Sequence, residues 1–561
     1  MAVREVCMRI LKAVELAGLL ILFSTASSWA APGDTLKSIP SPGPCPQGLT
    51  CDGKYLWVAD RKSDMMYQVD PTDGKIVDSI PAPGYSPRGL AWDGARLWCL
   101  DAEEGVIYAV NAKTRIIETA ISCPAATATD LAWDGKYLWV AADRSDEILQ
   151  ISPEDGTTIK KIPSPTGNAT GLTFDGTYLW VADRYKDMIY MVTPDKGEVI
   201  VYFGAPGKHA WGLAWDGKNL WNVDYQSDRI YQLTARDATP FVHLDEKTER
   251  MDFMIQARNY GPGIVKTLDL YIAVPQDLDN QKLLAPVTFD PAPTDILTDK
   301  WGQKVAHFRL ADVAATRFET VSMTASATLY QTRYYVYPDK VGTLNDIPAE
   351  IKKMYLVDDT KFSMTDPVIQ TALKGAVGDE TNPYWIARKI FRYVIDHMEY
   401  ELAGGWNIAP AVLERGNGSC SEYSFVYIAM CRAAGLPARY AGSIVVRGDD
   451  ASYDDVFHRW VEVYLPNYGW IPVDPSGGDN PRPADRARYF GFLDNRYLIT
   501  THGGGGSEYL EWGYNTNARW TGEGRCKVVV EYFGEWTPVT ENTGDQSTAT
   551  TAGGACVPKK E

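Results

Sequence analysis

Three residues in the C-terminal half of the chain have side chains that together could break an amide bond. Cys420 precedes a run typical of a helix, His458 opens a segment of alternating polarity, and Asp474 ends the segment that follows. A thiol can act as a nucleophile, an imidazole as its base, and a carboxylate can orient the imidazole. The chain has only six histidines, so a histidine at this place carries weight. The spacing predicts a Cys-His-Asp acyl-transfer site in which these three residues are catalytic.

The elements expected around these residues suit that chemistry. The helix expected from Cys420 stops at Gly435, which puts the thiol in the first turn, where unpaired amides and the helix dipole favour a thiolate and can hold an oxyanion. His458 and Asp474 belong to a strand pair joined by the loop 465–469. Side chains alternate between the two faces of a strand, so a loop with an odd number of residues puts His458 and Asp474 on the same face, diagonal to each other. Asp474 would then fix the imidazole tautomer while the other ring nitrogen serves the thiol.

Each of the three residues taken alone has a more ordinary explanation. A cysteine at the start of a helix is more often structural, and a histidine that starts a strand usually lies on the surface. An aspartate before a proline is commonly a turn residue. Their occurrence together, in this order and with compatible geometry, favours a site.

The stretches around these residues resemble the transglutaminase-like superfamily over about residues 365–500. The matching segments are 418–423, 431–439, 458–464 and 469–475. In that family the cysteine is the nucleophile, the histidine is general base and acid, and the aspartate orients the histidine. The resemblance implies those roles for Cys420, His458 and Asp474, and it implies a papain-like α+β domain.

The resemblance also suggests a residue for the oxyanion. Some members of the family use a tryptophan upstream of the cysteine to help hold it. Trp406 is the nearest match here, which makes it a candidate for oxyanion or substrate binding, with a place in the cleft wall as the alternative. Asn417 and Glu422 lie beside Cys420 and receive no catalytic role. No calcium-binding motif of the animal enzymes is visible, so calcium dependence is not implied, and neither a cofactor nor a metal site is predicted.

Residues 35–235 form an internal repeat. Two markers recur five times each at steps of 41 residues, namely Asp-Gly at 52, 93, 134, 175 and 216, and Leu-Trp with the tryptophan at 57, 98, 139, 180 and 221. That period, with four short apolar runs in each repeat, is typical of one blade of a β-propeller. We expect a five-bladed propeller over residues 31–238, closed by pairing of residues 35–40 with the fifth repeat. The pattern resembles the NHL/YVTN class of propellers, which implies an architecture but no activity.

The rest of the chain divides into three parts. Residues 239–345 show new strand patterns that predict a β-sandwich, similar to the β-domain found ahead of bacterial members of the superfamily. Residues 346–536, in which helical spacing begins, are assigned to the transglutaminase-like domain. Residues 537–561, rich in Ser, Thr and Gly, predict a disordered tail. The expected fold class is multidomain, with an all-β five-bladed propeller, a β-sandwich and an α+β catalytic domain.

Charge and the N-terminal segment limit partners and location. A net charge of −17 and a pI near 5.0 argue against nucleic acid, because phosphate binding needs a basic face. Basic residues precede the apolar run 16–23 and a small-residue stretch, which predicts a signal peptide over residues 1–30 with cleavage after Ala30. The run is too short to span a bilayer, so no transmembrane segment is expected. We expect an exported protein, secreted or periplasmic.

Two further groups of residues have open alternatives. In an oxidising compartment Cys45 could pair with Cys51 and Cys526 with Cys556, while buried free thiols are the plainer interpretation. Acidic loops that follow the second strand of three repeats could hold a cation, but turn-capping aspartates explain them more simply. These loops are 60–64, 183–187 and 224–228.

Together these patterns predict an exported cysteine enzyme that attacks amide bonds through a thioester acyl-enzyme. Water would complete hydrolysis, as in a peptidase or amidase, and an amine would complete transamidation, as in a protein-glutamine transamidase. The substrate would be a protein or a cell-wall peptide, with the propeller as a platform for the substrate or a protein partner. The alternative is a non-catalytic, propeller-based binding or assembly protein with a relic thiol fold. Relics usually lose one of the three catalytic residues, and this sequence keeps all of them.

Overall fold

The computed structural model describes residues 30–237, 239–402, 406–478 and 480–539. The chain forms two compact units, a repeat unit that ends at Thr239 and a C-terminal unit that begins at Pro240. Apart from Ala30, the predicted signal peptide lies outside the described residues. The tail predicted over residues 537–561 begins later than expected, because Thr537 and Pro538 belong to the strand β37 (Val528–Pro538), and its residues after 539 lie outside the described residues. Within the described residues, no helix has the length and apolar character needed to cross a membrane.

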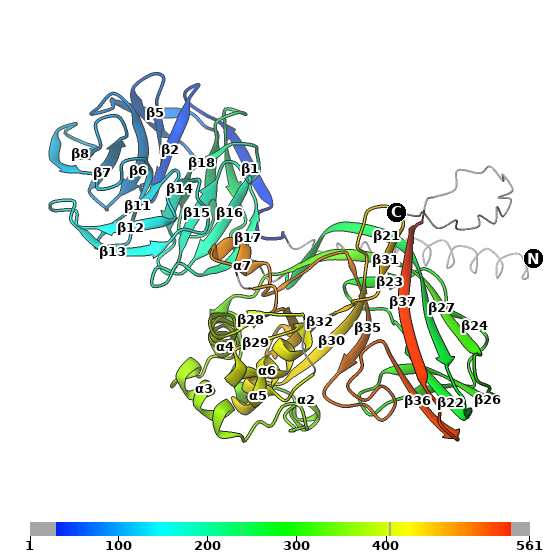
Figure 1. Ribbon diagram of the computed structural model, residues 1–561. Helices are drawn as coiled ribbons and strands as arrows, with labels where there is room; N and C mark the ends of the chain where they lie inside the picture. Colours follow the sequence, from blue (N-terminus) through cyan, green and yellow to red (C-terminus); the bar gives the residue numbers. More distant parts are fainter. Residues whose placement is uncertain (1–29, 238, 403–405, 479, 540–561) are drawn as a thin grey trace, which may run out of the picture. The chain divides into compact units, whose positions relative to one another are not determined.

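The repeat unit consists of five antiparallel sheets of four strands each (Figure 1). Four sheets follow chain order. They are β2 (Pro46–Cys51), β3 (Leu56–Asp60), β4 (Met65–Val69) and β5 (Ile76–Pro81), then β6 (Pro87–Trp92), β7 (Arg96–Asp101), β8 (Val106–Asn111) and β9 (Ile117–Ser122), then β10 (Ala128–Trp133), β11 (Leu138–Ala142), β12 (Glu147–Ile151) and β13 (Thr158–Pro163), then β14 (Ala169–Phe174), β15 (Leu179–Asp183), β16 (Met188–Val192) and β17 (Val199–Gly204).

The fifth sheet joins the two ends of the repeat region. It contains β18 (Ala210–Trp215), β19 (Leu220–Asp224) and β20 (Arg229–Leu233), and β1 (Thr35–Pro40) pairs with β20. Ile39 lies opposite Ile230 in this pairing. The predicted pairing of residues 35–40 with the fifth repeat is therefore confirmed.

One hydrogen bond explains why the two sequence markers recur together. In every repeat the indole N–H of the marker tryptophan donates to the aspartate of the Asp-Gly turn, at 2.8–3.0 Å. In the first repeat the same carboxylate of Asp52 also accepts the turn amides of Lys54 and Tyr55. Gly53 follows it with φ of 95°, a conformation that favours glycine. The carboxylate thus satisfies both the turn and a tryptophan that is almost fully buried.

The first strands of consecutive sheets approach one another closely. A Cβ on Gly48 would lie 2.0 Å from the carbonyl oxygen of Arg88, and a Cβ on Gly212 would lie 2.5 Å from that of Gln47. Contacts of this kind link β2 with β6, β6 with β10, β10 with β14, β14 with β18, and β18 with β2. Glycine recurs in four of the five repeats because a Cβ at Gly48, Gly89, Gly171 or Gly212 would collide with the neighbouring backbone.

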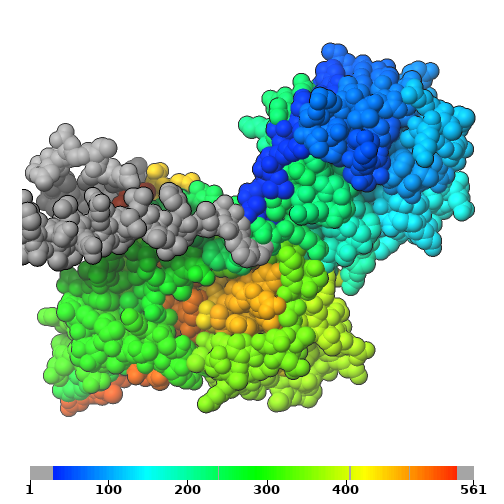
Figure 2. Space-filling model, turned by 180° about the vertical axis from the view of Figure 1, so that it is seen from behind, coloured from blue at the N-terminus to red at the C-terminus, as the bar shows by residue number. Residues whose placement is uncertain are grey.

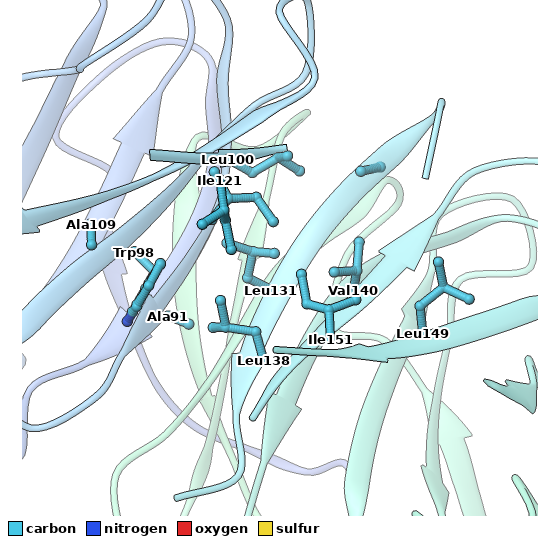
Figure 3. Close-up of a cluster of buried hydrophobic side chains, with 12 residues drawn as sticks. Ala91, Trp98, Leu100, Ala109, Ile121, Leu131, Leu138, Val140, Leu149 and Ile151 are labelled. Atoms are coloured by element: carbon cyan, nitrogen blue, oxygen red, sulfur yellow. The ribbon is translucent and has the colours of Figure 1, made fainter. Parts of the chain in front are cut away.

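The third repeat departs from that glycine pattern at Asp130. Its carboxylate accepts the amide N–H groups of Leu90 at 3.2 Å, Leu131 at 2.9 Å and Leu172 at 2.7 Å, and it also accepts the N–H of Leu213. These amides belong to four different sheets, so one buried side chain links β6, β10, β14 and β18. Between neighbouring sheets, apolar side chains such as Trp98, Leu131 and Ile151 fill the core (Figure 3).

Two expectations about single residues of this unit are settled by contacts. Cys45 and Cys51 are free thiols, in agreement with the plainer of the two alternatives, and Cys556 lies outside the described residues. In the first acidic loop the carboxylate of Asp60 accepts the N–H groups of Cys45, Lys62 and Ser63. That aspartate is a turn cap. The described residues contain no group of three acidic, His or Cys side chains arranged to hold a metal ion.

The C-terminal unit is built on three sheets and a set of helices. The first sheet contains β23 (Gln281–Leu283), β27 (Phe318–Tyr334), β21 (Phe241–Asn259), β37 (Val528–Pro538) and β31 (Ser452–Asp454), with β24 (Thr288–Asp290) and β34 (Phe492–Leu493) also on β27. The second contains β25 (Asp295–Thr298), β26 (Lys304–Val313), β22 (Ile264–Ala273) and β36 (Thr516–Glu523). The third contains β33 (Gly469–Val473), β32 (His458–Leu465), β30 (Ala438–Val445) and β35 (Tyr497–Gly503).

The helices of this unit are the short η1 (Pro338–Lys340) and η2 (Leu344–Asp346), then α2 (Ala349–Tyr355), α3 (Pro367–Val377), α4 (Pro383–His397), α5 (Ala409–Arg415), α6 (Cys420–Ala433) and α7 (Pro483–Ala487). Two of them, α4 and α6, pack against the third sheet, and α3 and α5 pack against α6. A short parallel pair, β28 (Glu399–Tyr400) and β29 (Asn417–Gly418), leads into α6. In Figure 2 the surface of the segment that follows β33 in the chain (orange) lies between that of the long strands (green) and that of the helices (yellow-green).

Strands from the predicted catalytic domain complete the two sheets that begin the unit. β36 pairs with β22, and β37 pairs with β21, although both strands follow the catalytic residues in the chain. β31 and β34 join the first sheet as well. Residues 239–345 and 346–536 therefore share sheets, because a strand pattern shows that a segment is extended but not which partner it finds.

Replacement of Asp130 by alanine is expected to destabilise the repeat unit by at least about 3 kcal/mol, because each unsatisfied buried donor costs about 1–3 kcal/mol. Hydrogen exchange measured peptide by peptide should show exchange about a hundredfold faster in β6, β10, β14 and β18. The control is Asp155→Ala, which removes an exposed turn cap on Thr157. Equal protection in both variants would contradict the bridging role of Asp130.

Candidate active site

Cys420 is the first residue of α6, a helix that is buried from Cys420 to Arg432. The N–H of Ser419, the residue before the helix, donates to Glu422 Oε2 at 3.1 Å. The helix stops where the sequence predicts, with Gly435 in a left-handed conformation at φ of 79°. The amide N–H of Cys420 has no hydrogen-bond partner among the described residues, and the side chain is 7% exposed. The thiol therefore lies at a helix N-terminus beside an available amide.

His458 and Asp474 come from the hairpin formed by β32 and β33. Val461 lies opposite Val473, and Leu465 lies opposite Gly469, which is the register predicted from the odd loop. His458 Nε2 and Asp474 Oδ2 are 2.8 Å apart. The predicted contact between these two side chains is confirmed.

Asp474 is itself held in place by the turn that follows it. Its Oδ1 accepts the N–H of Ser476 at 3.0 Å and the hydroxyl of the same residue at 2.6 Å. With Oδ1 bound by the turn, Oδ2 is left for His458. The carboxylate thus orients the imidazole ring and favours a proton on Nε2.

The thiol of Cys420 lies against the imidazole of His458, because α6 packs on β32. His458 acts on the thiol through a hydrogen bond and through its charge, and the backbone N–H of Arg459 donates to the sulfur. Since Nε2 faces Asp474, the nitrogen that serves Cys420 is Nδ1. The structure therefore brings all three predicted catalytic residues together.

The electrostatics of the three groups favour an ion pair. Burial opposes a thiolate, but the hydrogen bond and charge of His458 outweigh it, and the pKa of Cys420 is lowered. Burial likewise opposes the imidazolium, but Asp474 and Cys420 outweigh it, and the pKa of His458 is raised well above its ordinary value. Burial opposes the carboxylate, yet the pKa of Asp474 is lowered by His458 and Ser476. These groups titrate together. At pH values between the lowered pKa of Cys420 and the raised pKa of His458, the pair consists of a thiolate and an imidazolium.

Two cavities border the three residues. One, of about 180 Å³, is lined by Cys420, Trp406 and Tyr514 among others. The other, of about 160 Å³, is lined by His458 and Asp474 and by aromatic residues that include Trp460 and Tyr497. Only the first opens at the thiol, so it is the one that can admit an acyl group.

Trp406 lies in the wall of the cavity at the thiol. Its side chain is 39% exposed, and its ring lies 5.0 Å from Cζ of Arg459. The neighbouring amide of Asn407 donates to Glu422 Oε1 at 3.1 Å, which ties this segment to the start of α6. The place in the cleft wall agrees with the alternative given for Trp406, and its role toward an oxyanion stays a prediction.

Glu422 has a positioning role that the sequence did not reveal. It is fully buried and accepts from the backbone N–H groups of Ser419 and Asn407, while Arg415 NH2 lies 3.0 Å from its Oε2. It thereby connects the N-terminus of α6 with the segment that carries Trp406. Its position three residues after Ser419 is a capping-box spacing, and that spacing was the available signal.

Arg459 is a second residue that sequence reasoning missed. It is completely buried, and its Nε and Nη1 have no hydrogen-bond partner among the described residues. Four aromatic rings surround its guanidinium at 4.4–5.2 Å, namely those of Trp406, Phe425, Tyr440 and Tyr514. A charged residue inside a strand of buried neighbours was the only sign in the sequence, and the rings come from four separate segments.

Comparison with known proteins agrees with the geometry. Residues 370–475 match the transglutaminase-like superfamily. This segment is a transglutaminase-like core domain. The chain is also similar to an uncharacterized protein of Haemophilus influenzae, with 26% identity over 164 residues. That match covers 25% of this chain and 44% of the relative, so the chain spans less than half the length of that protein.

Solved structures resemble parts of the chain at low identity. A proposed cysteine protease from Cytophaga hutchinsonii is 14% identical with a TM-score of 0.39, and the match covers 55% of this chain and 96% of that one. Glutaminyl cyclase from Myxococcus xanthus is 14% identical with a TM-score of 0.33, over 36% of this chain and 94% of that one.

The lowered pKa of Cys420 predicts that iodoacetamide alkylates this thiol faster than a free thiol at pH values below about 8.5. Because the thiolate is the reactive form, the rate should fall only when the pH drops through the lowered pKa. In His458→Ala the midpoint should rise to about 8.5, the value of a free thiol, or above it, because burial raises the pKa of Cys420 and His458 no longer opposes it. Mass spectrometry assigns the label, and Cys431, fully buried with a raised pKa, should stay unlabelled in both proteins. An unchanged midpoint in the variant would contradict the Cys-His pair.

Replacement of Asp474 by asparagine is expected to raise the same midpoint and slow labelling at pH 6 at least about tenfold, since an amide cannot stabilise the imidazolium as a carboxylate does. The matched control is Asp494→Asn, which removes a carboxylate from the cavity that Asp474 also lines. The control should label like the parent protein. Equal effects of the two substitutions would show that general charge loss, not the His458 contact, is responsible.

Proposed function

We propose that this protein is an exported cysteine enzyme that cleaves or transfers amide-linked acyl groups. The observation that carries the proposal is the contact of Cys420, His458 and Asp474 at the start of a buried helix. The transglutaminase-like core supports it, because that superfamily contains cysteine peptidases and transglutaminases. A relic of such a site would keep the fold without the ion pair, so the binding-protein alternative is the weaker one.

The reaction follows from the positions of the three groups. The thiolate of Cys420 attacks the amide carbonyl carbon, and a C–S bond forms while the carbonyl π electrons move to oxygen. The free amide of Cys420 is placed to donate to that oxyanion. As the C–N bond breaks, His458 gives its Nδ1 proton to the leaving amine, which departs and leaves a thioester.

The thioester is resolved by a second nucleophile. His458, now neutral, takes a proton from water or from an amine, and the nucleophile attacks the thioester carbonyl. The C–S bond breaks and returns the thiolate, with a carboxylic acid as product from water or a new amide from an amine. We place hydrolysis first, as a peptidase or amidase, and transamidation of protein glutamine second.

For the repeat unit, we propose a closed five-bladed propeller that binds the protein or cell-wall peptide substrate, or a partner protein. The contacts of β18 with β2 and of β20 with β1 support a ring, and so does the bridge of Asp130 among four sheets. Closure would leave no sheet edge open to unwanted pairing. The predicted signal peptide supports export to the periplasm or the exterior.

The test is incubation of the full chain from residue 31 with a mixed-peptide digest in ¹⁸O-labelled water and a fluorescent primary amine. Hydrolysis would add ¹⁸O to new carboxyl termini, and transamidation would attach the amine to glutamine side chains. Either product should vanish in Cys420→Ala and persist in Cys431→Ala, which changes a buried thiol of the same helix. Product formation that survives Cys420→Ala, or no product from any peptide, would reject the proposal.

A further inference from the structure

The cavity at Cys420 is walled by aromatic side chains from separate parts of the chain. Trp406 precedes α5, Phe457 precedes β32, Tyr514 precedes β36, and Tyr532 lies on β37. Leu402 and Val456 complete the apolar part of the lining. Its volume of about 180 Å³ is comparable with cavities of about 150 Å³ that accept a benzene ring. One large side chain fits beside the thiol.

The rim of this cavity exposes apolar groups to an unusual degree. Leu402 is 59% exposed, Val456 48%, Tyr532 41% and Trp406 39%. A cluster of large, solvent-exposed apolar side chains around one cavity is typical of a binding site. Exposure of these side chains to water is unfavourable, and a ligand that covers them removes that cost. Their common neighbour is the nucleophile itself.

The polar side chains of the lining are poorly suited to a carboxamide. The side-chain amide of Asn515 would be the natural partner for a glutamine, but its Nδ2 donates to the Ser443 carbonyl oxygen at 3.2 Å and its oxygen accepts from Thr500. Among the described residues of the lining, Asp455 carries the single charged side chain and is exposed at the rim. Ser419 Oγ and Thr516 Oγ1 also line the cavity and lack a hydrogen-bond partner among the described residues. Each offers one hydroxyl, whereas a carboxamide has two N–H donors and a carbonyl acceptor to satisfy, so these groups replace only part of the hydrogen bonds that a glutamine makes with water.

Phe457 is held in a strained conformation that serves this wall. Its φ is 60°, in a region that bulky residues rarely adopt. The N–H of Phe457 donates to Asp454 Oδ1 at 3.2 Å, and its ring lies 5.8 Å from that of Phe253 and 5.7 Å from that of Tyr532. Because His458 is the next residue, the same packing builds the wall and directs the base toward the thiol.

We propose that the cavity is the acyl-donor subsite and that it selects a large apolar or aromatic side chain rather than glutamine. This inference rests on the proposed function, since it assigns the substrate of the same thiol. It makes the enzyme a peptidase or amidase for acyl groups with apolar side chains. Tyr532, on a strand of the first sheet of the unit, is then a specificity residue.

The experiment measures covalent inactivation of the full chain from residue 31 by three reagents. N-acetyl-phenylalanine chloromethyl ketone and N-acetyl-glutamine chloromethyl ketone differ only in the side chain presented to the subsite. In each, the thiolate forms a C–S bond and chloride leaves. Iodoacetamide lacks a side chain and reports the reactivity of the thiol alone. The phenylalanine reagent should react at least about tenfold faster than the glutamine reagent.

Variants of the wall separate specificity from reactivity. Tyr532→Ala and Val456→Ser should each lower the phenylalanine-to-glutamine ratio at least about threefold. The ratio compares two reagents on the same variant, so it does not depend on any change in thiol reactivity, which the iodoacetamide rate reports separately. Val456 is half exposed, so its replacement should not disturb folding. The Val456→Ser variant therefore still measures the selectivity of the cavity if Tyr532→Ala does not fold. The matched control is Tyr453→Ala, which removes a tyrosine that is 50% exposed and does not line the cavity, and it should keep the parent ratio.

The outcomes distinguish this inference from the proposed function. Fast iodoacetamide labelling with equal rates for the two ketones, or with a preference for glutamine, would overturn the apolar subsite and leave the cysteine enzyme standing. Slow iodoacetamide labelling with the pH profile of a free thiol would overturn both. A preference for phenylalanine that all three variants retain would show that the selectivity arises outside this cavity and would also reject the proposal.

Discussion

The site depends on the packing of one buried helix against one strand. The nucleophile Cys420 lies on α6 and its base His458 lies on β32. The two groups meet only because the helix packs against the strand. α6 has no exposed face, so α3, α4, α5, β30 and β32 enclose it and leave little freedom to slide or rotate. Interiors packed in this way transmit small displacements, and a nucleophile must stay within hydrogen-bond reach of its base. The buried helix is therefore a requirement of the chemistry as well as of stability.

The surrounding sheets add a second constraint, because they determine what reaches the thiol. β37 returns to the first sheet after the core is complete and places Tyr532 at the cavity. β31 pairs with β37 and carries Asp454, whose carboxylate holds the amide of Phe457. The sandwich strands and the transglutaminase-like core are thus parts of one unit, and the cavity wall exists only when both are folded.

The features that could be predicted from the sequence are those set by local rules. The helix start at Cys420, its stop at Gly435 and the hairpin register that brings His458 to Asp474 each follow from a few adjacent residues. The 41-residue period likewise predicted the repeated four-stranded sheets. The aromatic cage of Arg459 and the partners of β36 and β37 could not be predicted, because they join segments far apart in the chain. In the sequence, Asp130 is the one residue that replaces a recurring glycine. Its four amide partners could not be predicted, because they lie on four different sheets that meet only in the folded structure.

Burial and charge oppose each other at the thiol, and Arg459 shows how the conflict is resolved. A side chain 7% exposed loses most of the water that would solvate a thiolate, so the protein must supply positive potential. His458 supplies part of this positive potential, and Arg459 is the second cation near the thiol. If a carboxylate paired with Arg459, its negative charge would cancel the positive potential at the sulfur. Arg459 is instead held by four aromatic faces, which stabilise a cation without neutralising it. Because its backbone N–H also donates to the sulfur, one residue provides both a fixed charge and a fixed donor for the thiol.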